Sequence, residues 1–205
     1  MSDILCVTSR HLCRGDFLER IENAARCRPA GIILREKDLS QEEYKSLAEK
    51  ALKICELHHV PCILHSFISA AAELRAAAIH LPLHMLRGMS ETDKSKFSSI
   101  GASCHSMEDA EEAKRLGCSY IIAGHIFETH CKRGLPGRGI DFLKSICESI
   151  GLPVYAIGGI DQDNIKLIRR AGAVGACVMS GVMQCGNVRT YLNQFERSSD
   201  HELLC

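Results

Sequence analysis

Short apolar runs alternate along the chain with longer stretches of helical character. Each run looks like a strand buried in a sheet, because it is four or five residues long and ends in polar or turn-forming residues. The expected strands cover residues 4–8, 31–35, 62–65, 78–81, 100–104, 120–123, 154–157 and 176–179.

Helical signals fill the intervals between these runs. Ser40-Gln-Glu-Glu43 is a capping box, and it precedes an apolar face that recurs at helical spacing. A second helix is expected from Ser106, with acidic residues in its first turn, to Gly117. A third is expected from Asp161 to Gly172. Residues 66–98 fit the pattern least well.

Eight strands alternating with helices over 205 residues predict a parallel sheet, most simply a (β/α)₈ TIM barrel at the lower end of its size range. An open, doubly wound sheet is the alternative. No linker, low-complexity tract or charge run divides the chain, so residues 1–205 are expected to form one domain.

Composition narrows the choice of partners. The 25 basic residues balance 25 acidic ones, so no overall field attracts nucleic acid or an anionic membrane, and an anionic ligand needs a local site. The chain shows no signal-peptide pattern and no apolar stretch long enough to span a membrane, which predicts a soluble cytoplasmic protein. The 12 cysteines are scattered without a C-x-x-C pair, so we expect mostly small buried hydrophobes and no metal site.

Polar residues follow nearly every expected strand, and in a barrel the carboxyl ends of the strands carry function. Glycine or serine after the seventh and eighth strands lets backbone N–H groups converge on a phosphate, so a phosphorylated small molecule is the expected ligand. The strand ends read Arg35-Glu36-Lys37, His65-Ser66, Leu83-His84, Ser103-Cys104-His105-Ser106, Gly124-His125, Gly158-Gly159 and Ser180-Gly181.

Two of these strand ends suggest ligand contacts. Arg35 and Lys37 alternate with Glu36, so both basic side chains should point toward the barrel mouth and hold a carboxylate or phosphate. Ordinary ion pairs at an exposed strand end are the simpler alternative. After the fifth strand, Ser106 is explained as a helix N-cap, and His105 either faces the pocket or orients loops.

The segment Gly124–Gly139, GHIFETHCKRGLPGRG, is the densest cluster of reactive side chains. His125 emerges where a strand meets its loop, and an imidazole there can accept or donate a proton near neutral pH. Position alone leaves catalytic and structural roles for His125 open. His130 carries no signal of its own, and Cys131 has no evident base partner, so neither receives a role.

The phrases LREKD (34–38), IGASCHSMEDAEEA (100–113), AGHIFETHCKRGLPGRG (123–139), VYAIGGI (154–160) and AGAVGACVMSG (171–181) make the chain recognisable. In order and over nearly its whole length, it resembles the thiamine phosphate synthase and TenI superfamily. That resemblance implies a (β/α)₈ barrel. The phrase around His125 is similar to the TenI branch, whose members include thiazole tautomerase.

The resemblance to that branch implies an isomerase that converts a carboxylated dihydrothiazole ethyl phosphate into its aromatic carboxythiazole tautomer, with no metal and no cofactor. His125 matches the acid/base histidine. Gly159, Ser180 and the backbone at Met179 would hold the phosphate of this thiazole substrate. Carboxylate or phosphate contacts are implied for Arg35, Lys37 and Lys132. Ser103, His105 and Thr129 are further candidates for substrate contact.

Two alternatives from the same resemblance stay open: a thiamine phosphate synthase, which is a transferase, and a non-catalytic regulator that binds a thiazole phosphate. Synthases typically carry an Asn-Asp pair after the third strand and an acidic residue after the fourth, for pyrophosphate and Mg²⁺. This chain has His65-Ser66 and Pro82-Leu83-His84-Met85 instead, and Gly124-His125 replaces a Gly-Pro pair. TenI-type proteins often have Asn-Gly-Arg where this chain has His65-Ser66-Phe67. Association with further copies of the chain is left open.

Overall fold

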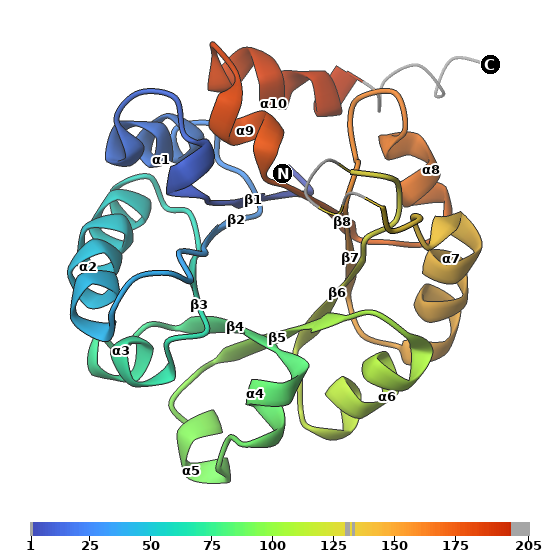
Figure 1. The fold of residues 1–205 in the computed structure, drawn as a ribbon, viewed down its shortest axis with the longest axis horizontal. Helices are drawn as coiled ribbons and strands as arrows, with labels where there is room; N and C mark the ends of the chain where they lie inside the picture. Colours follow the sequence, from blue (N-terminus) through green and yellow to red (C-terminus); the bar gives the residue numbers. More distant parts are fainter. Residues whose placement is uncertain (1, 130–131, 133, 198–205) are drawn as a thin grey trace.

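A closed ring of parallel strands forms the centre of the computed structural model, which describes residues 2–129, 132 and 134–197. The strands follow one another around the ring in chain order, and β8 closes it by pairing with β1, Ile4 opposite Ala176 (Figure 1). Closure confirms the predicted (β/α)₈ barrel and excludes the open sheet. The strands are β1 Ile4–Val7, β2 Gly31–Leu34, β3 Cys62–His65, β4 Ala78–Pro82, β5 Ser99–Cys104, β6 Tyr120–Gly124, β7 Val154–Ile157 and β8 Gly175–Val178.

Helices surround this ring on its outside (Figure 1). A short 3₁₀ turn, η1 Arg10–Leu12, follows β1. The α-helices are α1 Phe17–Ala25, α2 Gln41–Leu57, α3 Ile68–Glu73, α4 Leu83–Arg87, α5 Glu91–Lys94, α6 Met107–Arg115, α7 Gly139–Ile150, α8 Ile165–Arg170, α9 Ser180–Gln184 and α10 Val188–Arg197.

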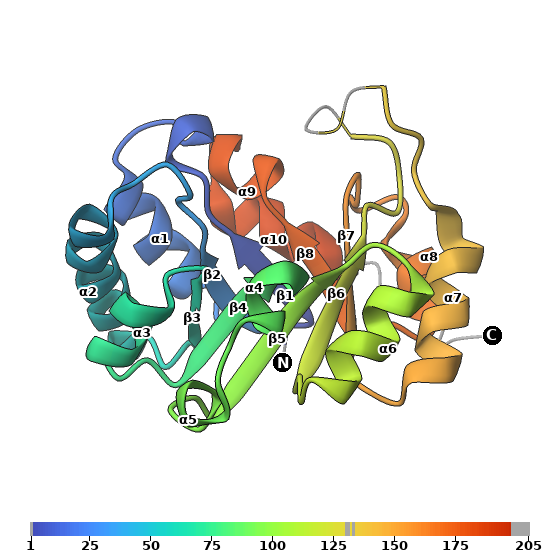
Figure 2. The same cartoon turned by 60° about the horizontal axis from the view of Figure 1, so that its bottom comes forward.

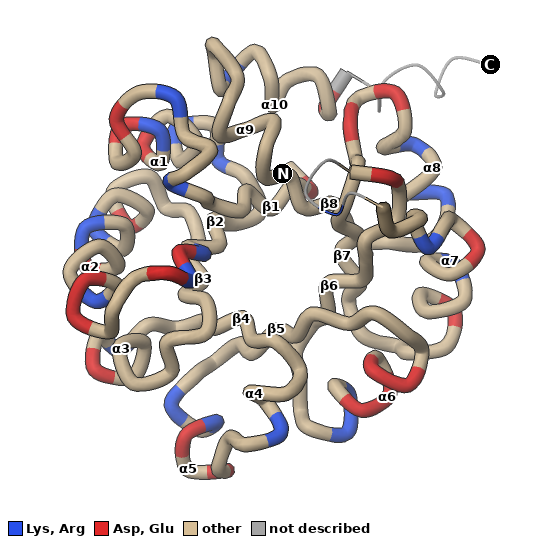
Figure 3. Tube along the Cα trace, in the orientation of Figure 1, with Lys and Arg blue, Asp and Glu red and all other residues tan. Residues whose placement is uncertain are grey.

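The two faces of each strand bury different cores. Side chains such as Leu5, Ile33 and Ile122 fill the inside of the barrel. Their neighbours along the strands, such as Ile4, Ile32 and Ile121, pack outward against the helices. None of the eight described strands contains Lys, Arg, Asp or Glu, and the charged residues lie on the helices and connections (Figure 3). Burial on both faces explains the continuous apolar runs in the sequence.

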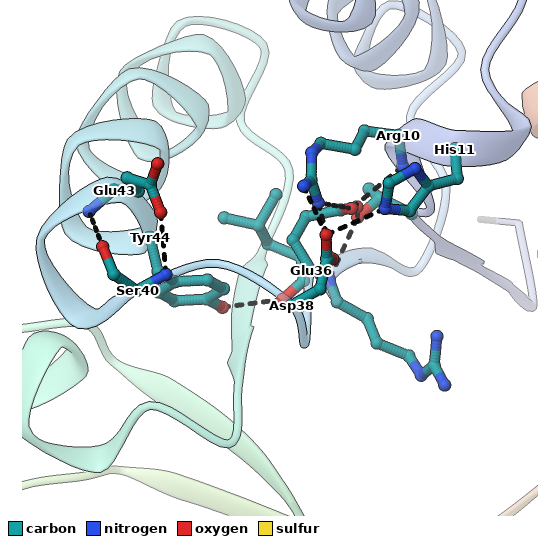
Figure 4. Close-up of polar contacts among 10 residues, drawn as sticks. Arg10, His11, Glu36, Asp38, Ser40, Glu43 and Tyr44 are labelled. Atoms are coloured by element: carbon teal, nitrogen blue, oxygen red, sulfur yellow. Dashed lines mark hydrogen bonds and ion pairs between the residues drawn. The ribbon is translucent and has the colours of Figure 1, made fainter.

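The helix boundaries follow from local hydrogen bonds. The Ser40 capping box forms as predicted: the Ser40 side chain accepts from the Glu43 N–H, and Glu43 accepts from the Ser40 N–H (Figure 4). Ser106 caps α6 by accepting from the Asp109 N–H at 3.1 Å.

The helix expected from Asp161 to Gly172 is too long in the prediction, since α8 covers only Ile165–Arg170. The Asp161 carboxylate accepts from the backbone N–H groups of Asp163 and Asn164, which holds residues 161–164 in a turn before the helix begins.

Residues 66–98, where the sequence pattern was weakest, fold into three short helices, α3, α4 and α5, on either side of β4. Their brevity leaves too few turns for a clear periodicity. The connection from β6 to α7 rises above the neighbouring loops at one end of the barrel (Figure 2). In the part of the chain that the structure describes, no helix has the length and apolar character needed to cross a membrane.

Candidate active site

A cavity of about 340 Å³ opens at the carboxyl ends of the strands. Every residue that the sequence singled out as a site candidate lines it, although the candidates come from five different strand ends. They are Arg35, Lys37, Ser103, His105, His125, Thr129, Lys132, Gly159, Met179 and Ser180. The volume lies within the range of small-molecule sites.

In the segment 35–38, which follows β2, successive side chains point in alternate directions, so the basic and acidic residues face different sides. Arg35 and Lys37 line the cavity. Glu36 points away from it and is buried, accepting from the Thr8 hydroxyl at 2.6 Å and from the Arg10 N–H at 2.9 Å. Asp38 is held outside the cavity by Arg10 and by His11, whose Nε2 lies 2.9 Å from Asp38 Oδ2 (Figure 4).

These contacts pair the carboxylates of Glu36 and Asp38 with groups outside the cavity. The hydrogen bonds from Arg10, and then those from His11, hold the pKa of the Asp38 carboxyl well below its usual range. Burial, together with Arg35 and Lys132 nearby, lowers the pKa of the Lys37 ammonium. Arg35, Lys37 and Lys132 therefore form a cluster of mutually repelling positive charges, here called the basic side of the cavity. An anion bound there would relieve that repulsion.

Two buried histidines form the wall next to the basic side. The Ser66 hydroxyl lies 2.7 Å from His65 Nδ1, and the His65 and His80 rings are 5.7 Å apart. His80 Nε2 lies 2.8 Å from the Ser103 hydroxyl, and its Nδ1 lies 3.2 Å from that of Tyr120. Burial, and then nearby positive groups, lowers the pKa of His65 to about 2 and that of His80 to about 3, so both are neutral at neutral pH.

Another side of the cavity is built largely from backbone. Gly158, Gly159 and Gly181 line it together with Met179 and Ser180, from the ends of β7 and β8; these five residues are here called the glycine side. Gly159 has a φ of +65°, and a Cβ there would lie 2.5 Å from the Glu128 carbonyl oxygen. Only glycine fits that position, and a left-handed backbone of this kind exposes N–H groups to an anion.

His125 and His105 lie between these two sides, at the ends of β6 and β5. His105 Nδ1 lies 2.7 Å from the Gly124 carbonyl oxygen, which fixes the orientation of that ring. His125 Nε2 lies 3.3 Å from the Leu135 carbonyl oxygen within the β6–α7 connection. A Cβ at Gly124 would lie 2.4 Å from the Ile157 carbonyl oxygen, so glycine is required where β6 passes β7. His130 and Cys131 lie outside the described residues.

Sequence reasoning missed or undervalued several lining residues. His65 received no role from the sequence, but it is buried and lines the cavity. His80, not singled out at all, is a polar residue flanked by apolar neighbours in β4, and that alternation was the available signal. Tyr191 reaches the cavity from α10, and nothing in its local sequence indicates this.

The divalent cation that a synthase resemblance implies does not fit these residues. Mg²⁺ prefers oxygen ligands, chiefly carboxylates. No Asp or Glu is among the described residues that line the cavity, and the positions concerned hold neutral His65, Ser66 and the segment 82–85. Within the described part of the chain, no group of three His, Cys, Asp or Glu side chains is arranged to hold a metal ion.

The fold and the site together define a (β/α)₈ barrel with a cavity that offers anions two different sides, one basic and one of backbone and serine. A family model described as thiamine monophosphate synthase matches residues 4–182. The chain belongs to that family, as its sequence phrases suggested.

Relatives from several bacteria support the assignment. The thiamine-phosphate synthase of Fusobacterium nucleatum is 33% identical over 186 residues, which is 88% of each chain. That of Alkaliphilus oremlandii is 32% identical over 189 residues, covering 89% of this chain and 88% of the relative. Among solved structures, a thiamine phosphate pyrophosphorylase from Pyrococcus furiosus has a TM-score of 0.82 at 24% identity, covering 96% of this chain and 94% of its own, which supports the fold.

The prediction of a thiazole tautomerase, and with it an isomerase, is wrong. The relatives are named as thiamine-phosphate synthases, which are transferases, and they match over most of the chain rather than at one loop. The tautomerase reading gave most weight to the phrase around His125, which forms one segment of the cavity wall. The acid/base role predicted for His125 belonged to that isomerisation and is withdrawn together with the tautomerase prediction.

Proposed function

We propose that the chain is a transferase of the thiamine-phosphate synthase type, joining a pyrimidine pyrophosphate to a thiazole phosphate. The observation that carries this proposal is the two-sided cavity, because two separate anion-binding sides suit two phosphate-bearing substrates. Near-full-length similarity to proteins named thiamine-phosphate synthase supports it. A cytoplasmic location and any assembly with further copies stay predictions.

The basic side is the better place for the pyrophosphate. Arg35 can contact two phosphate oxygens at once, while Lys37 and Lys132 act as point charges. Three positive groups also suit a diphosphate better than a single carboxylate. Arg35 and Lys37 are positioned before any ligand binds, because Glu36 between them is buried and paired on the other side of the segment.

The glycine side is the better place for the thiazole phosphate. Backbone N–H groups near Gly159 and the Ser180 hydroxyl offer neutral donors to a monophosphate. Between the two sides, apolar residues such as Ile122 and Ile157 line the cavity and offer a surface for the aromatic rings.

This placement fits the chemistry of the transfer. The thiazole nitrogen uses its lone pair to form a bond to the methylene carbon of the pyrimidine substrate. The C–O bond to pyrophosphate breaks, and pyrophosphate leaves with that electron pair. Negative charge grows on the leaving group, so fixed positive charges at the basic side stabilise the transition state. Neither reacting atom loses or gains a proton.

The test is to incubate the protein with both substrates and follow thiamine phosphate and pyrophosphate by chromatography. We expect equal amounts of both products, and a fall in kcat/KM of about 10- to 100-fold in Lys37→Met, the loss of one charge-assisted contact. Lys50→Met, on the exposed face of α2, is the matched control and should keep the parental rate. Binding of thiazole phosphate without any turnover would contradict the proposal and favour a regulator.

A further inference from the structure

Four acidic residues near the strand ends are held by partners outside the cavity. Glu36 is buried against Thr8 and Arg10, and Asp38 is paired with Arg10 and His11. Asp109 accepts from the His105 N–H at 2.8 Å at the start of α6. Asp161 holds its own turn through Asp163 and Asn164. Neither these four side chains nor that of Glu128 is among the residues that line the cavity, so no described carboxylate lines it.

The wall beside the basic side is also unsuited to a divalent cation. His65 and His80 are buried, and their hydrogen bonds run to the hydroxyls of Ser66, Ser103 and Tyr120 rather than to carboxylates. Neutral imidazoles and hydroxyls supply no negative charge. A dication in this place would face the charges of Arg35 and Lys37 with no carboxylate of the cavity wall to offset them.

We propose that the basic side binds pyrophosphate as the free anion, with Arg35, Lys37 and Lys132 supplying the positive charge that a divalent cation would otherwise bring. The choice of pyrophosphate as the anion rests on the proposed transferase function. The metal-free character of the site rests on the donor set alone.

The experiment is calorimetric titration of the full chain with pyrophosphate, first in EDTA and then in excess Mg²⁺. Pyrophosphate should bind in EDTA, and Mg²⁺ should weaken binding about tenfold or more, because chelation removes the charge that the basic side recognises. Lys37→Met should weaken binding in EDTA about tenfold, and Lys50→Met should leave it unchanged. Binding that requires Mg²⁺, or no binding in either condition, overturns the proposal.

A second variant tests the place of the anion. Ser66 lies beside His65, lines a neighbouring cavity together with Lys37, and has a φ of +68°, which aspartate and asparagine tolerate well. Ser66→Asp should lower pyrophosphate affinity in EDTA about tenfold through repulsion, whereas the neutral Ser66→Asn should change it little. Equal affinity of wild type and Ser66→Asp in EDTA would place the anion elsewhere and overturn the proposal.

The two proposals fail in different ways. One outcome is that thiamine phosphate forms only with Mg²⁺ and that the protein does not bind pyrophosphate in EDTA. This would contradict the metal-free site and support the transferase. The other outcome is that pyrophosphate binds in EDTA in a Lys37-dependent way but no product forms under any condition. This would contradict the transferase and support the metal-free site.

Discussion

The basic side and the glycine side of the cavity offer an anion different kinds of donor. The basic side depends on long side chains, and the direction of two of them, Arg35 and Lys37, is set by the pairing of Glu36 and Asp38 behind them. The glycine side depends on backbone held at positive φ and packed against the β6–α7 connection. The basic side can therefore be weakened by removing one charge at a time, whereas the glycines of the other side have no side chain to remove and are disrupted by an added Cβ.

The largest effect is expected at the glycine side, from Gly159→Ala. The added Cβ would meet the Glu128 carbonyl oxygen at 2.5 Å in a left-handed backbone, and should lower the free energy of unfolding by about 2–4 kcal/mol. Denaturant unfolding measures this. Binding of thiazole phosphate should weaken much more than binding of pyrophosphate.

Gly117→Ala separates backbone strain from the clash, because Gly117 has a φ of +87° with nothing within 4 Å of an added Cβ. It should cost about 1 kcal/mol. An equal cost in both variants would mean that close packing at Gly159 contributes nothing.

Glu36→Gln tests the support behind the basic side. The amide keeps one acceptor oxygen but turns an NH₂ group toward the donors on Thr8 and Arg10, which leaves a buried polar group unpaired. We expect a loss of about 1–3 kcal/mol in unfolding free energy, together with weaker pyrophosphate binding from misplaced Arg35 and Lys37. Thermal unfolding and calorimetry in parallel measure the two effects, and lost stability with unchanged binding would refute the positioning role.

The neutral histidines beside the basic side should make stability depend on pH. Burial lowers the pKa of His65 to about 2 and that of His80 to about 3, while the unfolded chain titrates near 6.5. Below pH 6.5 the unfolded state binds more protons, so stability is complete above that pH and declines as the pH falls toward 3. We expect a loss of about 1.5 kcal/mol for each of the two histidines between pH 6.5 and pH 5, measured by chemical denaturation.

His80→Gln should reduce that pH dependence, whereas His84→Gln, at an exposed position, should not. The same slope in both variants would assign the pH dependence to other groups.

The smallest effect is expected from Asp38→Asn, which removes the exposed half of the pairing behind the basic side. The pKa of Asp38 is held low by Arg10 and His11, but the carboxylate is in contact with solvent. Unfolding free energy should change by less than about 1 kcal/mol. A larger loss than that from Glu36→Gln would reverse the assignment of the buried residue as the main support.

Most of the fold was predictable because strands buried on both faces leave uninterrupted apolar runs. Residues 62–65 and 154–157 were predicted with the boundaries that β3 and β7 have, and the other strands differ by a residue at one or both ends. The start of α8 was mispredicted because Asp161 forms a turn rather than a cap. Helices α3, α4 and α5 were too short for a period to emerge.

Much of the cavity was also predictable, because the carboxyl ends of parallel strands must meet at one end of a barrel. His80 and Tyr191 were not, since His80 depends on which face of β4 turns inward and Tyr191 arrives from a distant helix. The tautomerase prediction failed for a related reason: one well-matched loop outweighed the chain as a whole.

The order of strands and helices, the capping of α2 and α6, and the set of polar residues at the strand ends were all predictable, because each depends on neighbours along the chain. Which charges face the cavity became clear only in the folded barrel. Glu36 and Asp38 turn to Thr8, Arg10 and His11, residues 25 or more positions away, and leave Arg35 and Lys37 unopposed. These hydrogen bonds form only when the ends of β1 and β2 come together, so no pattern of neighbouring residues records them.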